Sequence, residues 1–257
     1  MLRAGMTPDP WQCRLLNFLY KPRFRLLVNC ARQIGKSTAA GALALATALL
    51  YPKSDTVVIA RTQRQASEFI RRVKDFRIAL EYPVRSTPWA VRPASELDSL
   101  ILADLKAEEK WISEPVRDAI TIEEFPNRSR VVALPGKSAG AVVGYSAKLL
   151  IIDEACWFPD NSYVDIPGFL IRTGGSMLCL SYGGFLNGSW WDKAWHREKF
   201  WDRIREPISS CPHVDPELLR MEKERLSPMD FARNYECGFT PEEGAFFDSH
   251  DVERVFV

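Results

Sequence analysis

The stretch that decides the fold of this chain is Leu26-Leu27-Val28-Asn29-Cys30-Ala31-Arg32-Gln33-Ile34-Gly35-Lys36-Ser37-Thr38. An apolar run breaks here into a loop that ends in Gly-Lys-Ser, and an Ala-rich segment follows it. This order is typical of a phosphate-binding loop, in which a buried strand leads to backbone N–H groups at the start of a helix. Cys30 departs from the G-x-x-x-x-G-K-S/T pattern because it stands in place of the first Gly. The stretch predicts an α/β fold with a site for nucleotide phosphates.

Several residues in and before this loop are candidate ligands of the nucleotide. Lys36 supplies positive charge to the phosphates, and the Ser37 hydroxyl is a candidate ligand of Mg²⁺. Upstream, Gln12 could read the adenine amino group through its amide, although a lone Gln is usually a surface side chain. The residues expected around the nucleotide are Gln12, Gln33, Ile34, Gly35, Lys36, Ser37 and Thr38.

A second motif lies well downstream in Lys148-Leu149-Leu150-Ile151-Ile152-Asp153-Glu154-Ala155. The apolar run predicts a strand buried on both faces, and it ends in two adjacent carboxylates. In an ATPase, Asp153 would hold Mg²⁺ through its water shell, and Glu154 would polarise the water that attacks the γ-phosphate. An isolated Asp-Glu pair more often marks a strand end or caps a helix. Two such motifs in this order indicate a P-loop ATPase.

The composition is that of a globular protein. At 257 residues and 46% hydrophobic content, the chain can form one large α/β domain, or a core with a small subdomain. Its 34 Lys and Arg nearly balance 33 Asp and Glu, so any nucleic-acid contact must come from local basic stripes. Six cysteines without C-x-x-C spacing indicate reduced thiols of a cytosolic protein. No secretory signal is evident, and Ala39–Leu50 is too short to span a bilayer, so no membrane role is expected.

A basic stripe is predicted beside the phosphate-binding loop. Thr56–Ala60 has the pattern of a strand, and residues 61–80 have helical periodicity with one apolar face. The opposite face is rich in cations, which could contact a DNA backbone or could equally form a solvated surface. These cations are Arg61, Arg64, Arg71, Arg72, Lys74 and Arg77.

Further elements are predicted in the middle of the chain. Ala119–Glu123 and Arg130–Leu134 flank a turn and predict a hairpin, and Glu96–Lys106 is a predicted helix. Met177–Ser181 predicts a strand beside the one that carries the two carboxylates. Its terminal Ser181 could sense the γ-phosphate or be an ordinary strand-end hydroxyl.

The last part of the chain changes character. A tryptophan cluster is more typical of a core than of a base-stacking platform, and it consists of Trp190, Trp191, Trp195 and Trp201. Helices are predicted over Pro216–Arg225 and Pro228–Cys237, the second beginning with Ser227 as cap and Pro at its first position. We therefore divide the chain into an ATPase core, residues 1–204, and a small helical lid or linker, residues 205–257.

Together these motifs resemble the ATPase half of a phage terminase large subunit. The most specific element is the Arg-Gln-x-Gly-Lys-Ser loop, and the resemblance spans most of the chain. The segments that carry it are Trp11-Gln12, Ala31–Ser37, Leu134–Gly136, Gly144–Ala147, Ile151–Ala155 and Arg233–Glu236. The resemblance implies an ASCE, RecA-like P-loop NTPase fold with a mainly parallel central sheet flanked by helices, plus a C-terminal lid. It also implies ATP and Mg²⁺ as cofactors.

The resemblance further implies a function and partners. In that family the ATPase drives double-stranded DNA into an empty capsid, as a homo-oligomeric ring docked on the portal protein. A small terminase subunit is a further expected partner, a C-terminal nuclease cuts the concatemer, and the expected location is the host cytoplasm.

The resemblance assigns roles to individual residues of this sequence. Glu154 would be the catalytic carboxylate, Lys36 and Ser37 would bind phosphate and Mg²⁺, and Asp153 would hold the metal. Arg32 would report on the γ-phosphate, and Gln12 would contact adenine. The coupling segment would be Ser181, Tyr182, Gly183 and Gly184.

One departure from the family concerns an arginine finger. Many relatives carry an Arg where this chain has Val143, and that Arg can reach into the neighbouring subunit. Either Arg32 acts within its own chain, or another cation replaces the finger between subunits. An arginine finger contributes ~10³ to 10⁵ in rate, so its source decides whether an isolated subunit is active. The nearest candidate cations are Arg128, Arg130 and Lys137.

A second departure is length. The sequence stops near the place where a nuclease domain would begin, and Asp248, Asp251 and Glu253 are too few and too terminal to form a two-metal site. We expect no nuclease activity from this sequence, which would be an ATPase fragment or a subunit whose nuclease lies elsewhere.

Two alternatives to a packaging motor stay open. A helicase-like DNA translocase shares the Gln and Asp-Glu motifs but would need a second RecA-like domain, for which 257 residues leave no room. A nucleotide-dependent ring-assembly module with negligible turnover alone is compatible with Val143 at the finger position. A small-molecule kinase is disfavoured because Glu154 beside the metal ligand suits activation of water.

Overall fold

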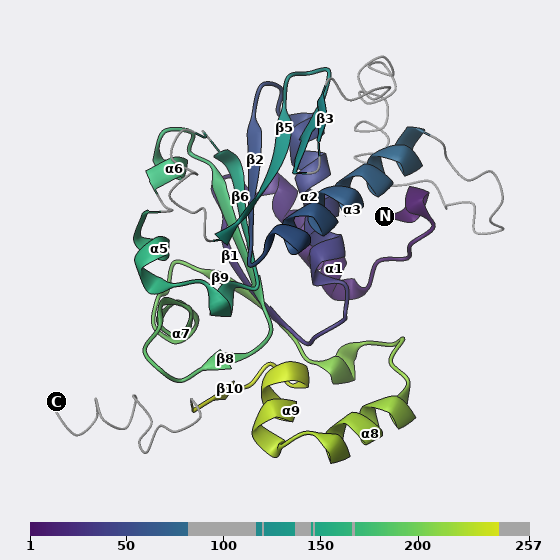
Figure 1. Ribbon diagram of the computed structural model, residues 1–257, viewed down its shortest axis with the longest axis vertical. Coiled ribbons are helices and arrows are strands. Elements are labelled where there is room, and N and C mark those ends of the chain that lie inside the picture. The colour runs from purple at the N-terminus through teal and green to yellow at the C-terminus, as the bar shows by residue number, and fades with distance from the viewer. Residues whose placement is uncertain (82–116, 120, 137–144, 146, 166–167, 242–257) are drawn as a thin grey trace.

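The computed structural model describes residues 1–81, 117–119, 121–136, 145, 147–165 and 168–241, and an eight-stranded sheet forms its centre (Figure 1). The strand order is β3-β4-β5-β2-β6-β7-β1-β9, and all neighbours are parallel except that β4 is antiparallel to β3 and β5. The predicted α/β fold with a mainly parallel sheet is confirmed. The strands are β1 (Arg25–Cys30), β2 (Asp55–Ala60), β3 (Arg117–Ala119), β4 (Ile122–Glu124), β5 (Arg130–Pro135), β6 (Ala147–Asp153), β7 (Ser176–Ser181) and β9 (Asp202–Glu206).

Several sequence-based expectations can be compared with these strands. The predicted hairpin is the antiparallel pair of β4 and β5, and β3 extends it by one more antiparallel strand. The strands predicted at Thr56–Ala60 and Met177–Ser181 are β2 and β7. Other predictions fall outside the described residues, namely the helix Glu96–Lys106, the positions Lys137 and Val143, and the carboxylates Asp248, Asp251 and Glu253.

The carboxyl ends of the three central strands meet at one edge of the sheet. β7 lies between β6 and β1, so Asp153 is in register with Leu180, and Asn29 is in register with Ser181. The phosphate-binding loop leaves β1 at this same edge. Ligands of parallel α/β sheets bind outside the carboxyl ends of the strands, so this topology places the two sequence motifs next to each other.

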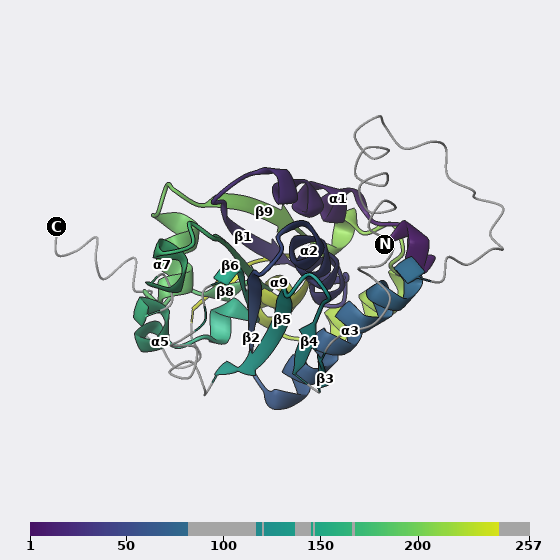
Figure 2. The ribbon, with the colours of Figure 1, turned by 90° about the horizontal axis from the view of Figure 1, so that it is seen from above.

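Helices cover both faces of the sheet (Figure 2). α1, α2 and α3 lie on one face, and α5, α6 and α7 lie on the other. Strand residues alternate between the two resulting cores, with Leu26 and Val28 in the first and Leu27 in the second. None of the described helices has both the length and the apolar character needed to cross a membrane. The helices are α1 (Pro10–Leu16), α2 (Lys36–Leu50), α3 (Gln63–Glu81), α5 (Asp160–Asp165), α6 (Gly168–Ile171), α7 (Trp190–His196), α8 (Pro216–Arg225) and α9 (Pro228–Tyr235).

The tryptophan cluster is part of the second core, as predicted. Trp190, Trp191 and Trp201 are buried among Leu27, the neighbouring strand residues and α7, and Trp195 packs against them partly buried. The Trp191 indole N–H donates to the Gly183 carbonyl at 3.0 Å. The cluster therefore anchors the segment that follows β7.

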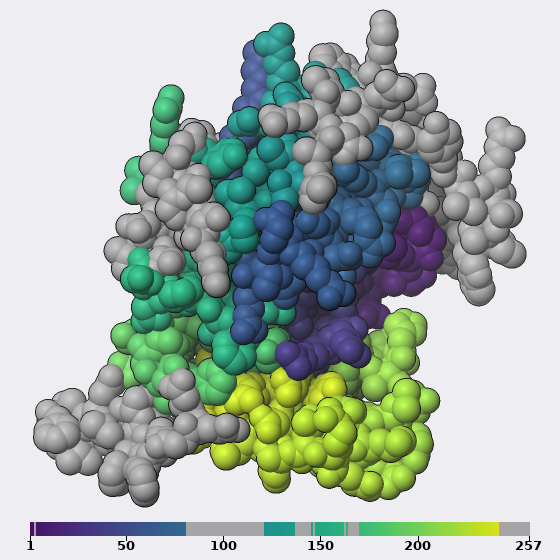
Figure 3. All heavy atoms as spheres, in the orientation of Figure 1, coloured from purple at the N-terminus to yellow at the C-terminus, as the bar shows by residue number. Residues whose placement is uncertain are grey.

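The C-terminal helices α8 and α9 lie against the carboxyl edge of the sheet (Figure 3). Ser227 caps α9 as predicted, because its hydroxyl accepts a hydrogen bond from the Asp230 N–H at 3.1 Å. α9 ends at Tyr235, two residues before the predicted end, and Cys237 adopts a left-handed φ of 57°. β9 continues through Glu206, two residues past our division at residue 204, and the division into two domains stays a prediction.

Most of the predicted basic stripe on α3 is already paired with carboxylates. Arg77 is buried and donates to Glu123 at 2.8 Å, and Lys74 approaches the same carboxylate at 3.9 Å. Arg71 is paired with Glu68 at 2.7 Å. Arg71, Lys74 and Arg77 are thus engaged within the fold, and DNA contact by the stripe as a whole stays a prediction beside the alternative of a solvated surface.

Candidate nucleotide-binding site

The phosphate-binding loop has the backbone of an anion-binding turn. Gln33 and Gly35 adopt left-handed φ values of 62° and 83°, and α2 begins at Lys36. A Cβ atom at Gly35 would lie 2.7 Å from the Gln12 amide nitrogen. Only glycine fits there, because both the backbone conformation and the close approach of Gln12 exclude a side chain. Cys30 can stand where the motif usually has its first Gly, because this position is the last residue of β1. The Cys30 side chain is buried there, and the residue is in register with Glu206.

Lys36 lies inside this loop. Its ammonium donates to the carbonyl oxygens of Ala31 at 2.7 Å and Cys30 at 3.2 Å. Burial lowers the pKa of Lys36, because the charged form loses water that carbonyl oxygens replace only in part. The loop itself places no negative charge beside the Lys36 ammonium. A phosphate oxygen bound next to the ammonium would supply that negative charge.

Ser37 and Asp153 form a pair of oxygen ligands suited to Mg²⁺. The Ser37 hydroxyl donates to Asp153 Oδ2 at 2.8 Å, and the Glu154 N–H donates to Asp153 Oδ1 at 3.1 Å. Burial raises the pKa of Asp153, although these hydrogen bonds and Lys36 act in the opposite direction. The described residues contain no group of three or more His, Cys, Asp or Glu that could hold a metal alone. Mg²⁺ is commonly bound by one or two protein oxygens, and phosphate and water oxygens complete its coordination.

Glu154 stands beside this pair with a partly exposed carboxylate. Its φ of 57° is left-handed, which is uncommon for a residue with a long side chain. The carboxylate lies 4.0 Å from the Arg61 guanidinium, and Arg61 also lies over the Trp157 ring at 4.7 Å. The sequence did not reveal Arg61 as a neighbour of Glu154, because Arg61 follows a different strand, β2, whereas Trp157 lies three residues after Glu154.

Arg32 is held above the loop by Tyr182. The Arg32 guanidinium donates to the Tyr182 hydroxyl at 3.0 Å and lies 4.3 Å from the centre of its ring. The same hydroxyl accepts a hydrogen bond from the Trp157 indole N–H at 2.9 Å. Tyr182 therefore joins the loop arginine to the segment after Glu154, and the predicted coupling residue lies within the site.

Asn29 connects the phosphate-binding strand to both neighbouring segments. It is fully buried, its side-chain oxygen accepts from the Gly183 N–H at 2.7 Å, and its side-chain amide donates to the Cys237 carbonyl at 3.1 Å. Ser181, the other candidate sensor, accepts from the Cys156 N–H at 3.2 Å. Sequence analysis missed Asn29, although a single amide inside an apolar strand was the signal that could have revealed it.

The C-terminal helices α8 and α9, which we predict to form a lid, cover one side of the site. The Arg32 backbone N–H donates to the Asn234 carbonyl at 2.9 Å, which joins the loop directly to the end of α9. A cavity of about 370 Å³ lies between the loop and the lid, with Gln33 and Ile34 on one side and Leu218, Leu219 and Tyr235 on the other. Such a cavity, with apolar walls and a few polar groups, is typical of small-molecule sites.

Gln12 lies at the border of the loop and is buried. Its amide oxygen accepts from the Asp9 N–H at 3.0 Å, and its amide nitrogen donates to the Ile34 carbonyl at 3.4 Å. The first contact completes a capping box at the start of α1, which fixes the side chain against the loop. Thr38 lies with Ser37 in the first turn of α2.

The candidate finger residues lie far from this edge. Arg128 and Arg130 precede or begin β5, which is parallel to β2, so they lie at the amino edge of the sheet. Arg130 is held by Asp55 through two hydrogen bonds of 2.8 and 3.0 Å. Neither residue is close to Lys36 in its own chain, and a role toward a neighbouring subunit stays a prediction.

We expect Gly183→Ala to loosen the lid. A Cβ atom would lie 2.4 Å from the Arg233 carbonyl oxygen and 2.5 Å from that of Gly238, and the φ is 42°. Strain and overpacking together should lower the stability by about 2 to 4 kcal/mol, measurable by thermal unfolding. The matched control is Gly188→Ala, where φ is 68° but the nearest atom lies at 4.0 Å. Equal losses in both variants would show that the lid contact is unimportant.

Comparisons with known proteins support the family and the fold. The family model described as "Terminase large subunit, T4likevirus-type, N-terminal" matches residues 27–166. A comparison with curated proteins finds no match. Among solved structures, the ATPase domain of the Thermus phage P74-26 large terminase has a TM-score of 0.64 at 17% identity, covering 91% of this chain and 95% of that one.

Two longer terminases have the same fold over part of their length. The large terminase of a thermophilic bacteriophage has a TM-score of 0.62 at 10% identity, covering 90% of this chain and 53% of that one. The HK97 bacteriophage large terminase has a TM-score of 0.57 at 12% identity, covering 90% and 50%. The chain thus spans about half the length of these two proteins.

Proposed function

The chain belongs to the terminase large subunit family, and on this premise we propose that it is an ATP-hydrolysing motor domain that moves double-stranded DNA into a viral procapsid. The observation that carries the proposal is the hydrogen bond between Ser37 and Asp153, with the Glu154 carboxylate beside it and Lys36 inside the adjoining loop. The large terminase of the thermophilic bacteriophage, which has this fold, has been solved with ADP and with ATP-gamma-S.

The chemistry follows from the positions of these groups. Lys36 and the loop N–H groups would bind the phosphates, and Ser37 and Asp153 would hold Mg²⁺, which neutralises phosphate charge when bound. Glu154 would accept a hydrogen bond from the attacking water and so orient it toward the γ-phosphate. Arg32 would exchange its contact with the Tyr182 hydroxyl for one with the γ-phosphate.

The nucleotide base would lie in the cavity between the loop and the lid. Arg32 and Asn29 contact the backbone of Asn234 and Cys237, so a change at the phosphates would be transmitted to the lid through two hydrogen bonds. Expected partners are double-stranded DNA, the portal protein, the small terminase subunit and further copies of this chain in a ring, in the host cytoplasm.

The experiment that tests this function is steady-state Mg²⁺-ATP hydrolysis over a range of protein concentrations. A rate per chain that rises with concentration would mean that a neighbouring copy completes the site. A constant, measurable rate would mean that Arg32 suffices within one chain. Nucleotide binding without turnover at every concentration, unchanged by added DNA, would contradict the motor and favour a ring-assembly module.

Gln12 gives a second prediction about this site. If its amide reads adenine, Gln12→Ala should weaken ATP binding by about tenfold and leave GTP binding nearly unchanged, because only the base-specific hydrogen bonds are lost. The measurement is calorimetric titration with both nucleotides. Gln63→Ala, an exposed Gln at the start of α3, is the control and should change neither affinity. Equal weakening of ATP and GTP would mean that Gln12 only supports the loop.

A further inference from the structure

The amino edge of the sheet, opposite the nucleotide site, is strongly basic. Because β1, β2, β5, β6, β7 and β9 are parallel, the residues that precede or begin these strands all lie at this edge. The segments at this edge contain ten Lys or Arg and four Asp or Glu. They are residues 17–25, 50–55, 124–130, 147–148, 168–176 and 197–202. The whole chain has a net charge of only +1, so the positive charge is concentrated here.

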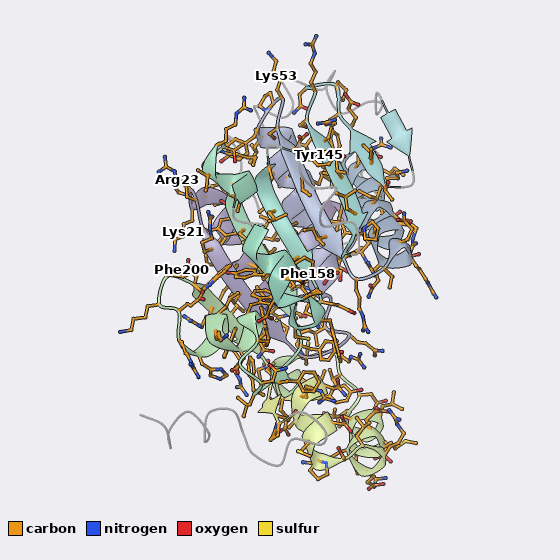
Figure 4. The ribbon with its side chains drawn as sticks, turned by 60° about the vertical axis from the view of Figure 1, so that its left-hand side comes forward. Lys21, Arg23, Lys53, Tyr145, Phe158 and Phe200 are labelled. Atoms are coloured by element: carbon orange, nitrogen blue, oxygen red, sulfur yellow. The ribbon has the colours of Figure 1, made fainter. Side chains whose placement is uncertain are left out.

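The four carboxylates neutralise only part of this charge. Asp55 is paired with Arg130 at 2.8 Å, and Asp202 is paired with Lys21 at 2.6 Å. Neither Arg23 nor Lys148 forms an ion pair with any residue that the structure describes. In Figure 4, Lys21, Arg23 and Lys53 lie on the part of the molecule away from α8 and α9, and Arg23 and Lys53 extend outward. The charges of Arg23 and Lys53 therefore face solvent.

A hollow at this edge brings three of the cations together. A cavity of about 240 Å³ is lined by Lys21, Arg23 and Lys148, and no carboxylate of the described residues lines it. The Ser176 hydroxyl is also in the lining, whereas the Thr173 hydroxyl found there already donates to the Ala147 carbonyl. Cations and hydroxyl donors without carboxylates are the groups that bind phosphate oxygens in protein–DNA contacts.

We propose that this amino edge, centred on the hollow formed by Lys21, Arg23 and Lys148, binds the phosphate backbone of a DNA duplex. The cations come from six loops spread along the edge rather than from one compact pocket, which suits an extended polyanion better than a single small anion. Bound there, the duplex would lie across the sheet from the nucleotide, so the strands themselves would connect the two sites.

The cations of this edge differ from several cations of the α3 stripe in their ion pairing. The α3 cations Arg71, Lys74 and Arg77 are paired with carboxylates of the fold, whereas Arg23 and Lys148 form no ion pair with a described residue. The proposal names the DNA-contact surface of the motor and to that extent rests on the proposed function. DNA binding is therefore measured without nucleotide, and ATP hydrolysis is measured without DNA.

The test compares two double variants that remove the same charge. Binding of a short fluorescein-labelled DNA duplex is followed by anisotropy between about 50 and 200 mM salt, the range in which counterion release is readily measured. In Arg23→Gln/Lys148→Gln, the slope of log K against log salt should fall by about 2, because each phosphate contact contributes about 0.9. In the control Arg64→Gln/Arg72→Gln on α3, the slope should be unchanged.

Other outcomes would overturn the proposal. Equal loss of DNA affinity in both double variants would indicate a response to net charge rather than to this edge. Unchanged DNA binding together with lost binding of poly-glutamate would indicate an acidic protein partner at this edge. Thermal unfolding checks that each variant is folded, and basal ATP hydrolysis should stay at the wild-type rate in both.

Discussion

Glu154→Gln should lower the rate of Mg²⁺-ATP hydrolysis by about 10³-fold, within the range that a positioned general base contributes. The amide keeps the size of the side chain and its place after β6, but it cannot take up the proton of the attacking water. ATP binding should stay within about threefold of wild type, because Lys36, Ser37 and Asp153 are unchanged. Steady-state hydrolysis and nucleotide titration measure the two quantities separately.

The matched control is Glu68→Gln on α3. Glu68 is an exposed carboxylate whose partner is Arg71, so its removal should leave hydrolysis unchanged. Retention of wild-type activity in Glu154→Gln would mean that another group activates the water. Loss of ATP binding together with hydrolysis would mean instead that Glu154 shapes the loop, and its left-handed backbone would then be its main contribution.

Asp153→Asn should have two opposite effects, loss of hydrolysis and a gain in stability of the metal-free chain. Loss of a metal ligand removes several kcal/mol of charge stabilisation, so hydrolysis should fall by about 10² to 10³-fold. Burial raises the pKa of Asp153 above its ordinary value of 3.8, so the ionised carboxylate opposes folding when no metal is present. A neutral amide relieves this penalty, and the Tm of the metal-free variant should exceed that of wild type.

The pH dependence checks the sign of this effect. A carboxyl group with a raised folded-state pKa binds its proton more tightly in the folded chain, so the penalty is complete above that pKa. It disappears as the pH falls below the unfolded-state pKa of about 4. The difference in Tm between Asp153→Asn and wild type should therefore shrink on acidification. Asp75→Asn, an exposed carboxylate on α3, is the control.

A metal titration separates the two roles of Asp153. Addition of Mg²⁺ and ADP should raise the Tm of wild type and have a smaller effect on Asp153→Asn, because ligand binding to the folded state stabilises it in proportion to affinity. A variant that is less stable than wild type without metal at neutral pH would contradict our account of the buried carboxylate.

Local sequence was sufficient for the two motifs of the site. A loop between an apolar strand and an Ala-rich helix, followed later by an apolar strand ending in Asp153-Glu154, predicted the parallel sheet and assigned Ser37 and Asp153 to the same Mg²⁺; the structure places the two side chains 2.8 Å apart. The prediction succeeded because the carboxyl ends of parallel strands all lie at one edge of the sheet, whichever segments connect the strands. The capped start of α9 at Ser227 was predictable for a similar local reason.

The neighbours of these motifs were not predictable, since they depend on which loops fold together. Arg61 meets Glu154 only because β2 lies beside β6, and Asn29 reaches Cys237 only because the chain after α9 returns to the sheet. The cations of α3 show the limit of a local pattern. Its periodicity was correctly interpreted as a helix, but Arg77 points to the buried Glu123 of β4, and helical periodicity does not reveal that partner.

The sequence by itself determined the class of fold and the candidate residues for phosphate binding, metal binding and water activation, because each of these depends on a short run of neighbouring residues. Only the tertiary structure decided where the positive charge of the Lys and Arg side chains is concentrated. Lys21, Arg23, Lys53, Lys148 and Arg172 are far apart in the chain, and a net charge of +1 conceals them. They share one edge because parallel strands also begin at a common edge, so loops that are distant in sequence become neighbours in space.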